Sequence, residues 1–455
     1  MSKDSRKNNW TDKIWNFIDN IEGDKVVWVI VFMLIIFSIL AIFSSTSLLT
    51  EGTKDRMDFI RDHIIVVGIG LGIIAGLYNI KRIGVFRILS QLGFIVSLFF
   101  LVMLDAHIKI PGLIEAEHIN GAWRTLRVAG LQIHVFEVVK VAMVLYLAWA
   151  LHAYKEDKDA CNRGETSKYF KFCNSFKDST NFPFLGKPLA KRLIYMYIPI
   201  LLVCVMVLMG SGSSAIFIGV ILIAVLLIGG APFKEIAIAA VAGVALLMMI
   251  VGLYNATDGK VLPVFERVAT MTTRLETEYD VDNLKQLRVG SNAFFRELDK
   301  IKQPYSAKIA IHEGGILGKG IGGSTQKYVV SNIYGDYMFS FIVEEYGLLG
   351  GILIILLYVS LLARGSLIAS KCSNEYAKIA VGGLSILITA QAFMHMLVNV
   401  DIGPMTGQTL PLISHGSFAF LVFCIAFGVI LSISRMAREE IKEVEEAAEP
   451  LYESR

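Results

Sequence analysis

The sequence predicts an all-α polytopic membrane protein with ten transmembrane helices, both termini cytoplasmic and a large extracytoplasmic loop between helices 7 and 8. Composition is the first observation: 55% of the 455 residues are hydrophobic and 18% are charged, whereas about 25% are charged in a soluble protein. Mean hydropathy, the second, is +0.59. The third is a series of apolar runs that reach the ~20 residues needed for a membrane helix. A net charge of +3 is too small to indicate nucleic-acid binding.

The apolar runs give the individual spans in order. We place them at residues 26–45, 63–80, 84–104, 132–152, 191–209, 213–230, 235–254, 337–361, 378–398 and 415–434. The first run follows a polar segment and has no small-residue cleavage site, so we expect a retained helix and not a signal peptide. Splitting one run, or merging two, would change the number of spans.

Basic residues in the connections indicate orientation, because cytoplasmic loops are enriched in Lys and Arg. With ten spans, the basic segments all fall on one side, which is then cytoplasmic. Their basic residues are Lys3, Arg6, Lys7, Lys13, Lys81, Arg82, Lys155, Lys158, Arg163, Lys168, Lys171, Lys234, Arg364, Lys371, Lys378, Arg435 and Arg438. We therefore expect a cytoplasmic segment at 1–25, a membrane domain at 26–434 and a charged cytoplasmic tail at 435–455, which includes a short solvated helix at 439–450.

Three connections are long enough to carry function. Residues 153–190 form a basic cytoplasmic loop, for which contact with anionic lipid is the simplest role. Residues 105–131 and 255–336 lie on the outer side. The amphipathic stretch at 284–301 predicts that the larger outer loop is a partly helical, ordered lid.

The larger outer loop ends in the glycine-rich stretch AIHEGGILGKGIGGSTQKY, residues 310–328. It formally contains a G-x-G-x-x-G pattern, but no strand precedes it, and no Ser or Thr follows Lys319 as a P-loop requires. Two interpretations remain. One is a tight turn that returns the chain to the membrane. In the other, successive backbone N–H groups face an anion.

Polar groups also lie within or beside the spans. Glu137 and Lys140 are three residues apart and share a helix face, as an internal ion pair or as a site for a phosphate headgroup. Arg124 lies at the outer interface. The stretch 391–417 contains several helix breakers at membrane depth, where non-helical backbone is tolerated inside protein or beside a wet cavity.

Three carboxylates mark the start of the eighth span. Asp336 lies at the water boundary, whereas Glu344 is eight residues further along, roughly 12 Å of helical rise. That distance is too long for a pair of acids acting together, as in glycosidases. We expect Glu344 and Glu345 to bind partners inside the bundle, or to pair with Lys140.

These stretches together resemble the SEDS family (shape, elongation, division and sporulation), which includes FtsW and RodA. The resemblance runs along most of the chain. It is carried by NGAWRTLRV (120–128), FEVVKVAMVLYLA (136–148), AIHEGGILGKGIGGSTQKY (310–328), YGDYMFSFIVEEYGLLGG (334–351) and PMTGQTLPLISHGS (404–417). Departures occur at Thr125 in place of tryptophan, at Val135 and Phe136 in place of proline and serine, at GSGSSA (210–215), which lacks the family's acid, at Tyr334 and Gly335, and at SHGS (414–417).

The resemblance implies a peptidoglycan glycosyltransferase in the bacterial cytoplasmic membrane. Such proteins polymerise lipid II, an undecaprenyl pyrophosphate disaccharide-pentapeptide, at the outer face. They act with a class B penicillin-binding protein, a transpeptidase, and with other divisome membrane proteins. The sequences of residues 409–414 and 23–49 favour the FtsW, cell-division branch over the RodA, elongation branch. A lipid II flippase and a non-catalytic scaffold for the transpeptidase remain alternatives.

The chemistry requires one outer carboxylate as base and cations for the departing pyrophosphate. We assign the base to Asp336. Candidate substrate-binding residues are Arg124, Glu137, Lys140, Lys319, Gln326, Lys327, Ser414 and His415. Candidate supporting residues are Glu344, Glu345, Gln391, Pro404, Gly407 and Pro411. The cysteines have no metal-ligand spacing, so we expect no dedicated metal site, although a divalent cation, Mg²⁺ or Mn²⁺, can share the charge.

Overall fold

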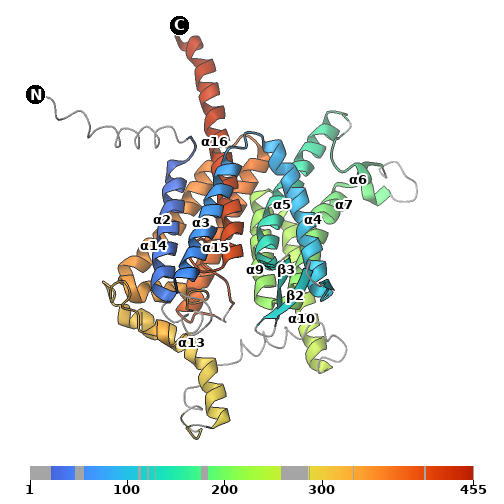
Figure 1. Ribbon diagram of the computed structural model, residues 1–455. Coiled ribbons are helices and arrows are strands. Elements are labelled where there is room, and N and C mark those ends of the chain that lie inside the picture. Colours follow the sequence, from blue (N-terminus) through green and yellow to red (C-terminus); the bar gives the residue numbers. More distant parts are fainter. Residues whose placement is uncertain are drawn as a thin grey trace, which may run out of the picture.

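The computed structural model describes most of the chain as a helical bundle (Figure 1). The described residues are 22–46, 56–110, 114–119, 122–128, 130–165, 167–175, 183–257, 285, 287–289, 291–330, 333–403 and 406–453. The α-helices are α2 (Lys25–Ser45), α3 (Arg56–Tyr78), α4 (Ile83–Asp105), α5 (Val135–Asn162), α6 (Lys171–Ser175), α7 (Pro188–Arg192), α8 (Ile198–Gly210), α9 (Gly212–Ile228), α10 (Phe233–Ala256), α13 (Asn292–Gly314), α14 (Met338–Lys371), α15 (Glu375–Asn399) and α16 (Ser417–Glu453). A π-helical turn, η3 (Leu193–Tyr197), joins α7 to α8.

The predicted membrane class is confirmed at the level of helix length and composition. Among the described residues, nine helical segments are long and apolar enough to cross a bilayer, and Pro188–Gly210 counts as one of them. Helix α9 has 17 residues and is therefore about 26 Å long, a little less than the ~30 Å hydrocarbon core. The predicted number of ten thus depends on whether α9 crosses the membrane.

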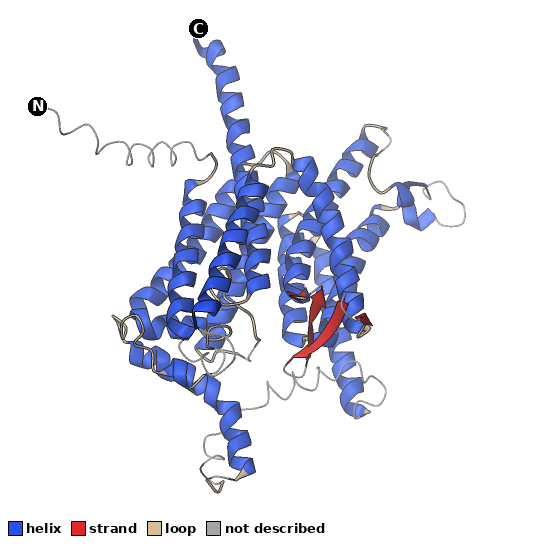
Figure 2. Cartoon of the chain, in the orientation of Figure 1, coloured by secondary structure: helices blue, strands red, loops and turns tan. Residues whose placement is uncertain are grey.

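The all-α prediction is wrong in one segment, because part of the loop at 105–131 folds as a sheet (Figure 2). Four antiparallel strands lie in the order β1-β2-β3-β4: β1 (Lys109–Ile110), β2 (Ile114–Ile119), β3 (Ala122–Val128) and β4 (Leu131–His134). Apolar side chains alternate along them, and Ala116, Leu126 and Ile133 are buried. An alternation with a period of two residues is typical of a strand. In segments this short, the alternation distinguishes a strand from a loop only when the partner strands are known.

Several predicted boundaries are also wrong. Helix α5 begins at Val135, after β4, and extends to Asn162 instead of ending at residue 152. Helix α14 extends to Lys371, ten residues beyond the predicted end at 361. Helix α16 continues without a break from the membrane segment to Glu453, so the acidic tail is part of that helix. Helices often run past their apolar segment when the following residues are good helix formers.

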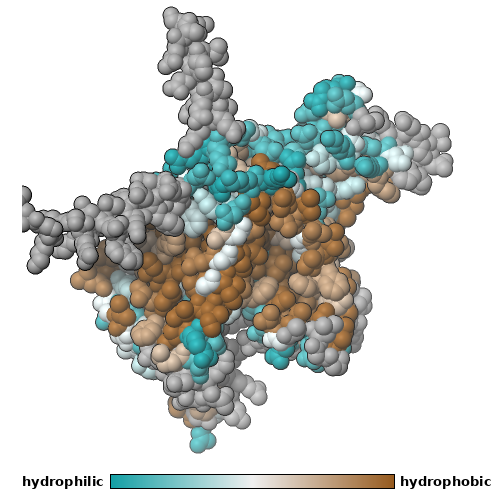
Figure 3. Space-filling model, turned by 45° about the horizontal axis from the view of Figure 1, so that its top comes forward, coloured by the Kyte–Doolittle hydropathy of each residue, from teal (hydrophilic) through white to brown (hydrophobic). Residues whose placement is uncertain are grey.

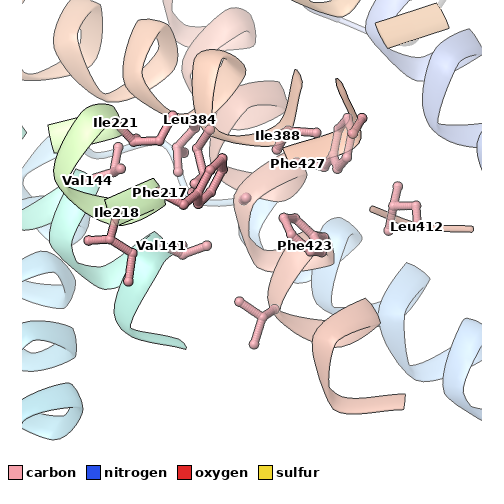
Figure 4. Packing of buried hydrophobic residues seen from close by; sticks show 14 of the residues in the cluster. Val141, Val144, Phe217, Ile218, Ile221, Leu384, Ile388, Leu412, Phe423 and Phe427 are labelled. Carbon is pink, nitrogen blue, oxygen red and sulfur yellow. The ribbon is translucent and has the colours of Figure 1, made fainter. Parts of the chain in front are cut away.

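The core of the bundle lies where α5, α9, α15 and α16 meet. Val144 on α5, Ile218 on α9 and Leu384 on α15 pack together, with Phe427 of α16 nearby (Figure 4). Apolar side chains cover the outside of the helices, and hydrophilic residues surround the end from which α16 projects (Figure 3). We call this end the tail end. The opposite end, which carries the sheet, α13 and the connection 400–416, is called the site end (Figure 1).

Candidate functional site

Asp336 lies at the site end in a turn, residues 333–337, immediately before α14 begins at Met338. Its side chain is partly buried. The phenol of Tyr334 lies close to it: burial, together with the charge of Asp336, raises the pKa of Tyr334. The predicted base therefore lies at the site end of the bundle, which we call its mouth, and precedes the helix. A base that meets a substrate from outside the membrane requires such a position.

Two side chains of α15 satisfy the first backbone groups of α14. The side-chain oxygen of Asn399 accepts from the backbone N–H of Ser340 at 2.9 Å, and its amide donates to the carbonyl of Asp336 at 3.0 Å. The ring Nε2 of His395 accepts from the N–H of Phe339 at 3.3 Å, so its Nδ1 donates to the carbonyl of Gln408 at 2.8 Å. A helix start has unpaired N–H groups, and here another helix supplies the acceptors.

The connection 400–416 supports the Asp336 turn from the other side. Ser414 donates its hydroxyl to the carbonyl of Gly335 at 2.8 Å, and the backbone N–H of His415 donates to the carbonyl of Tyr334 at 2.8 Å. With Asn399, three successive carbonyls, those of residues 334, 335 and 336, are fixed. Helix breakers were predicted in this connection and it is non-helical where described; Pro404 lies outside the described residues, and Gly407 has a positive φ of 63°.

His415 packs its ring between aromatic side chains. The ring centroids of Phe59 and Tyr334 lie 4.3 Å and 5.7 Å from that of His415. Burial lowers the pKa of His415 to about 4, and the charge of Asp62 opposes that shift in part. The imidazole is therefore neutral near pH 7 and stiffens the turn through packing.

Lys140 forms the centre of a second polar group, a short distance inside the bundle. Its ammonium donates to the side-chain oxygens of Glu137 (2.7 Å), Gln391 (2.5 Å) and Gln408 (2.8 Å). All three donors of the ammonium are thus used, and the side chain is 1% exposed. Ser214 accepts from the amide of Gln408 at 3.1 Å. The expected pair of Glu137 and Lys140 is confirmed, and the suggested pairing of Lys140 with Glu344 or Glu345 is wrong.

A continuous hydrogen-bonded path joins the two polar groups. Gln408 contacts Lys140 through its side chain and His395 through its backbone, and His395 and Asn399 hold the start of α14. Arg124 approaches the same connection, since a Cβ built on Gly407 would lie 3.5 Å from its guanidinium. Lys140, Gln408 and the Asp336 turn are therefore parts of one structural unit.

Glu344 is enclosed by the glycine-rich stretch. Its carboxylate accepts from Lys319 at 2.9 Å, from the hydroxyl of Ser324 at 2.5 Å and from the N–H of Thr325 at 2.7 Å, with further contacts to the N–H of Gln326. Backbone N–H groups do face an anion, as one of the two interpretations proposed. That anion is a carboxylate of the protein itself.

Glu345 is held in a similar way. The hydroxyl of Ser44 and the N–H of Gly322 donate to it at 2.5 Å and 3.0 Å. Lys327 is buried and donates to the carbonyl of Gly322 at 2.8 Å. The ammonium groups of Lys319 and Lys327, expected to meet substrate, thus have partners within the protein. Gln326 is buried beside them.

The glycines allow this stretch to pair with a break in α14. At Gly347 the helix has a φ of 72°, and the N–H groups of Lys319, Gly320 and Leu348 bond across to the carbonyls of Glu344, Glu345 and Gly315. A Cβ at Gly318 would lie 2.2 Å from the carbonyl oxygen of Glu345. The turn interpretation is therefore also confirmed, since the stretch returns the chain to α14.

Several supporting residues, among them His395 and Asn399, were missed in the sequence, whereas Gln391 was predicted. Gln391, His395 and Asn399 recur at intervals of four residues along an apolar helix, and this polar stripe is a readable signal, because polar groups inside membrane helices usually have partners. Gln408 and Ser214 had no such signal. Pro411, a predicted supporting residue, accepts from the hydroxyl of Tyr358 through its carbonyl at 2.5 Å.

Fold and site together define a polytopic α-helical membrane protein with a carboxylate at one mouth and a buried ion pair beneath it. The family model FTSW_RODA_SPOVE, described as "Cell cycle protein", matches residues 24–439. The chain therefore belongs to this family, the SEDS family that its motifs resemble.

Comparisons with individual proteins agree. A protein of Enterococcus hirae named "Probable peptidoglycan glycosyltransferase FtsW" is 27% identical over 433 residues, covering 92% of this chain and 95% of that protein. The crystal structure of the rod shape determining protein RodA of Thermus thermophilus has a TM-score of 0.51 at 17% identity, covering 92% of this chain and 98% of that one. A chain of a structure described as "Structural coordination of polymerization and crosslinking by a peptidoglycan synthase complex" has a TM-score of 0.55 at 18% identity, covering 91% and 98%. The similarity to these two solved structures shows a shared fold.

Proposed function

We propose that this protein is a peptidoglycan glycosyltransferase that polymerises lipid II into glycan strands, with septal synthesis during cell division as its setting. Family membership and the name of the Enterococcus hirae relative support this function. The structural observation that carries it is the Asp336 turn, whose three carbonyls are held by Ser414, the backbone of His415 and Asn399. A base needs such preorganisation, because small displacements of a reacting group are costly in rate.

In the reaction, the 4-hydroxyl oxygen of one sugar bonds to the anomeric carbon of another. The bond from that carbon to the pyrophosphate of the lipid breaks, the pyrophosphate departs with the electron pair, and Asp336 takes the hydroxyl proton. General base catalysis of this kind contributes ~10²–10⁴-fold. Arg124 is the candidate cation for the developing charge on the pyrophosphate. Lys140 fixes Gln408 and Gln391, whereas Lys319 and Lys327 hold the glycine-rich stretch in place.

A divalent cation, Mg²⁺ or Mn²⁺, fits this site as a companion of the pyrophosphate. Among the described residues, no three His, Cys, Asp or Glu side chains gather as a metal cage. Magnesium commonly keeps several waters and binds one or two carboxylates together with substrate phosphates. Asp336 is the carboxylate at the mouth that such an ion would meet, and the ion would supply positive charge to the leaving group.

The orientation of the protein follows from the same proposal. The site end faces outward from the bacterial cytoplasmic membrane, and the tail end, with its many Lys and Arg residues, faces the cytoplasm. A class B penicillin-binding protein would cross-link the strands, in line with the solved complex whose description joins polymerisation and crosslinking. Other divisome membrane proteins complete the expected set of partners.

Product analysis of purified protein tests the function. Wild type, Asp336→Asn and the control Asp58→Asn are incubated with lipid II, with and without the cognate transpeptidase, and the products are separated on a gel. Asp58 is a half-exposed carboxylate near the start of α3 that pairs with Arg61, so its loss should be harmless. We expect glycan strands from wild type and Asp58→Asn, and a loss of ~10²–10⁴-fold in Asp336→Asn. Normal strands from Asp336→Asn would refute the base assignment.

The alternatives give different products. A lipid II flippase would move the headgroup across a vesicle membrane without forming any polymer. A non-catalytic scaffold would form no polymer either as wild type or as the variants. The RodA-type elongation role predicts the same strands, so depletion in cells distinguishes it: filaments indicate a division role, whereas round cells indicate an elongation role.

A further inference from the structure

A cationic cavity lies at the tail end, far from the Asp336 turn. It has a volume of about 480 Å³ and lies between the start of α2, the end of α14 and the α16 segment around residue 437. Its charged lining residues are Asp24, Lys25, Arg364, Lys371 and Arg438. Four cations and one acid give this cavity a formal charge of +3. Its position between three helices distinguishes it from a basic patch on an open surface.

Asp24 and Arg364 form the frame of the cavity. The carboxylate of Asp24 accepts from the N–H groups of Val26 and Val27 at 3.0 Å and 3.2 Å, and so caps α2. It also accepts from Arg364 at 2.8 Å, and the N–H of Asp24 donates to Ser434 on α16 at 2.8 Å. The acid is therefore fully engaged in joining the three helices, and its charge is matched by a single guanidinium.

The remaining cations leave positive charge at the opening. Lys371 and Arg438 are both exposed, on α14 and α16. Arg438 donates to the carbonyl of Gly23 at 3.1 Å, a neutral acceptor that holds the side chain without cancelling its charge. An anion in the cavity would meet these two groups.

An apolar surface continues from the cavity along α2. Val26 lines the cavity, and Val29, Met33 and Ile36 follow it at spacings of three and four residues, on one helix face. These three side chains are 54%, 43% and 50% exposed. The stripe lies on the outside of the bundle and runs from the polar tail end toward the apolar middle of α2. A ligand that fits both features has an anionic head and a long apolar chain.

We propose that this cavity is a binding site for an anionic phospholipid, with the phosphate headgroup between Lys371 and Arg438 and an acyl chain along the α2 stripe. Basic pockets between membrane helices bind such headgroups. Free phosphate or an acidic peptide would use the cations but not the apolar stripe. The bound lipid would link α2, α14 and α16, and the site is independent of the proposed function.

The test uses the full chain in phosphatidylcholine nanodiscs with a minor share of phosphatidylglycerol. Native mass spectrometry measures which lipid stays bound, and thermal unfolding is followed with added short-chain phosphatidylglycerol, short-chain phosphatidylcholine or inorganic phosphate, since a ligand of the folded state raises the midpoint. The variant is Lys371→Gln with Arg438→Gln. The control, Lys187→Gln with Lys234→Gln, removes two exposed lysines elsewhere on the basic connections.

We expect wild type and control to retain phosphatidylglycerol selectively and to be stabilised by it. A cation near a headgroup contributes about fivefold in affinity, so the double variant, which loses two cations, should bind about 25-fold more weakly. Equal retention in the double variant would overturn the proposal, as would equal losses in the control. Stabilisation by inorganic phosphate as strong as that by the lipid would also overturn it, because the site would then bind free anions.

Discussion

At the scale of single residues, Lys140 shows how one buried charge of a family motif is stabilised by its hydrogen-bond partners. A buried ammonium is stable only when its donors are satisfied, and here Glu137, Gln391 and Gln408 accept all three. The spacing of Glu137 and Lys140 was readable in the sequence. Gln408 was not, because it lies 268 residues away in the chain, and nothing local indicates that it turns inward. The charge therefore helps to order the connection 400–416, together with the hydrogen bonds made by Ser414, His415 and His395.

This arrangement predicts that Lys140→Met is more harmful than the double change Lys140→Met with Glu137→Gln. The single variant leaves the carboxylate of Glu137, which is 12% exposed, without its cation, and breaking a buried pair costs about 3–5 kcal/mol. Removing both charges avoids that cost, so the double variant should unfold at a higher temperature than the single one. Thermal unfolding in detergent measures the difference. Equal midpoints would mean that the pair is not coupled.

At the scale of elements, α14 depends on groups outside itself at two points. Its first N–H groups bond to His395 and Asn399 of α15, and its break at Gly347 is closed by the glycine-rich stretch. The apolar run predicted the helix, and the glycines predicted a tight turn. The break itself could not be predicted, since Gly347 alone is compatible with an intact helix; its conformation depends on pairing with residues 315–320.

Asn399→Asp removes the donor of Asn399 and keeps its acceptor. An aspartate keeps an oxygen for the N–H of Ser340 but, when ionised, cannot donate to the carbonyls of Asp336 and His395. Because residue 399 is fully buried, the carboxylate also carries a desolvation penalty, so we expect a lower unfolding midpoint together with slower glycan polymerisation. Asn399→Ala should lose both the donor and the acceptor: an unsatisfied buried group costs about 1–3 kcal/mol. The comparison requires the unfolding midpoint and the polymerisation rate of each variant. Full activity in Asn399→Asp would show that the bond to Asp336 does not position the base.

Gly318→Ala tests the pairing between the glycine-rich stretch and α14. Gly318 and Gly320 both have positive φ, 80° and 86°, so alanine costs about 1 kcal/mol at either position. At Gly318 the new Cβ would also overlap the carbonyl of Glu345, whereas at Gly320 it meets nothing within 4 Å. Limited proteolysis of the stretch 315–328 should therefore be much faster in Gly318→Ala than in Gly320→Ala. Similar rates in both variants would show that backbone conformation alone matters.

At the scale of the whole molecule, apolar runs and basic connections were sufficient to predict a helical membrane protein, and the motifs indicated its family. They were not sufficient for the sheet at 109–134, where alternation within short strands is visible only beside the partner strands. The site at the mouth was partly predictable: Asp336, Glu137 and Lys140 come from motifs. Its supporting contacts from α15 and the connection 400–416 join residues far apart in sequence, and such pairings follow from the packing of the bundle.

The position of α9 decides which side of the membrane each later helix begins on. If its 17 residues cross the membrane, Lys234 lies in the cytoplasm and Ala256, at the far end of α10, lies outside. Single-cysteine variants in a background without the five native cysteines test this with a membrane-impermeant maleimide. We expect Ala256→Cys to react in intact cells and Lys234→Cys to react only after permeabilisation. The reverse pattern would mean that α9 does not cross, and it would place the Asp336 turn in the cytoplasm, where a polymerase of outer-leaflet lipid II could not work.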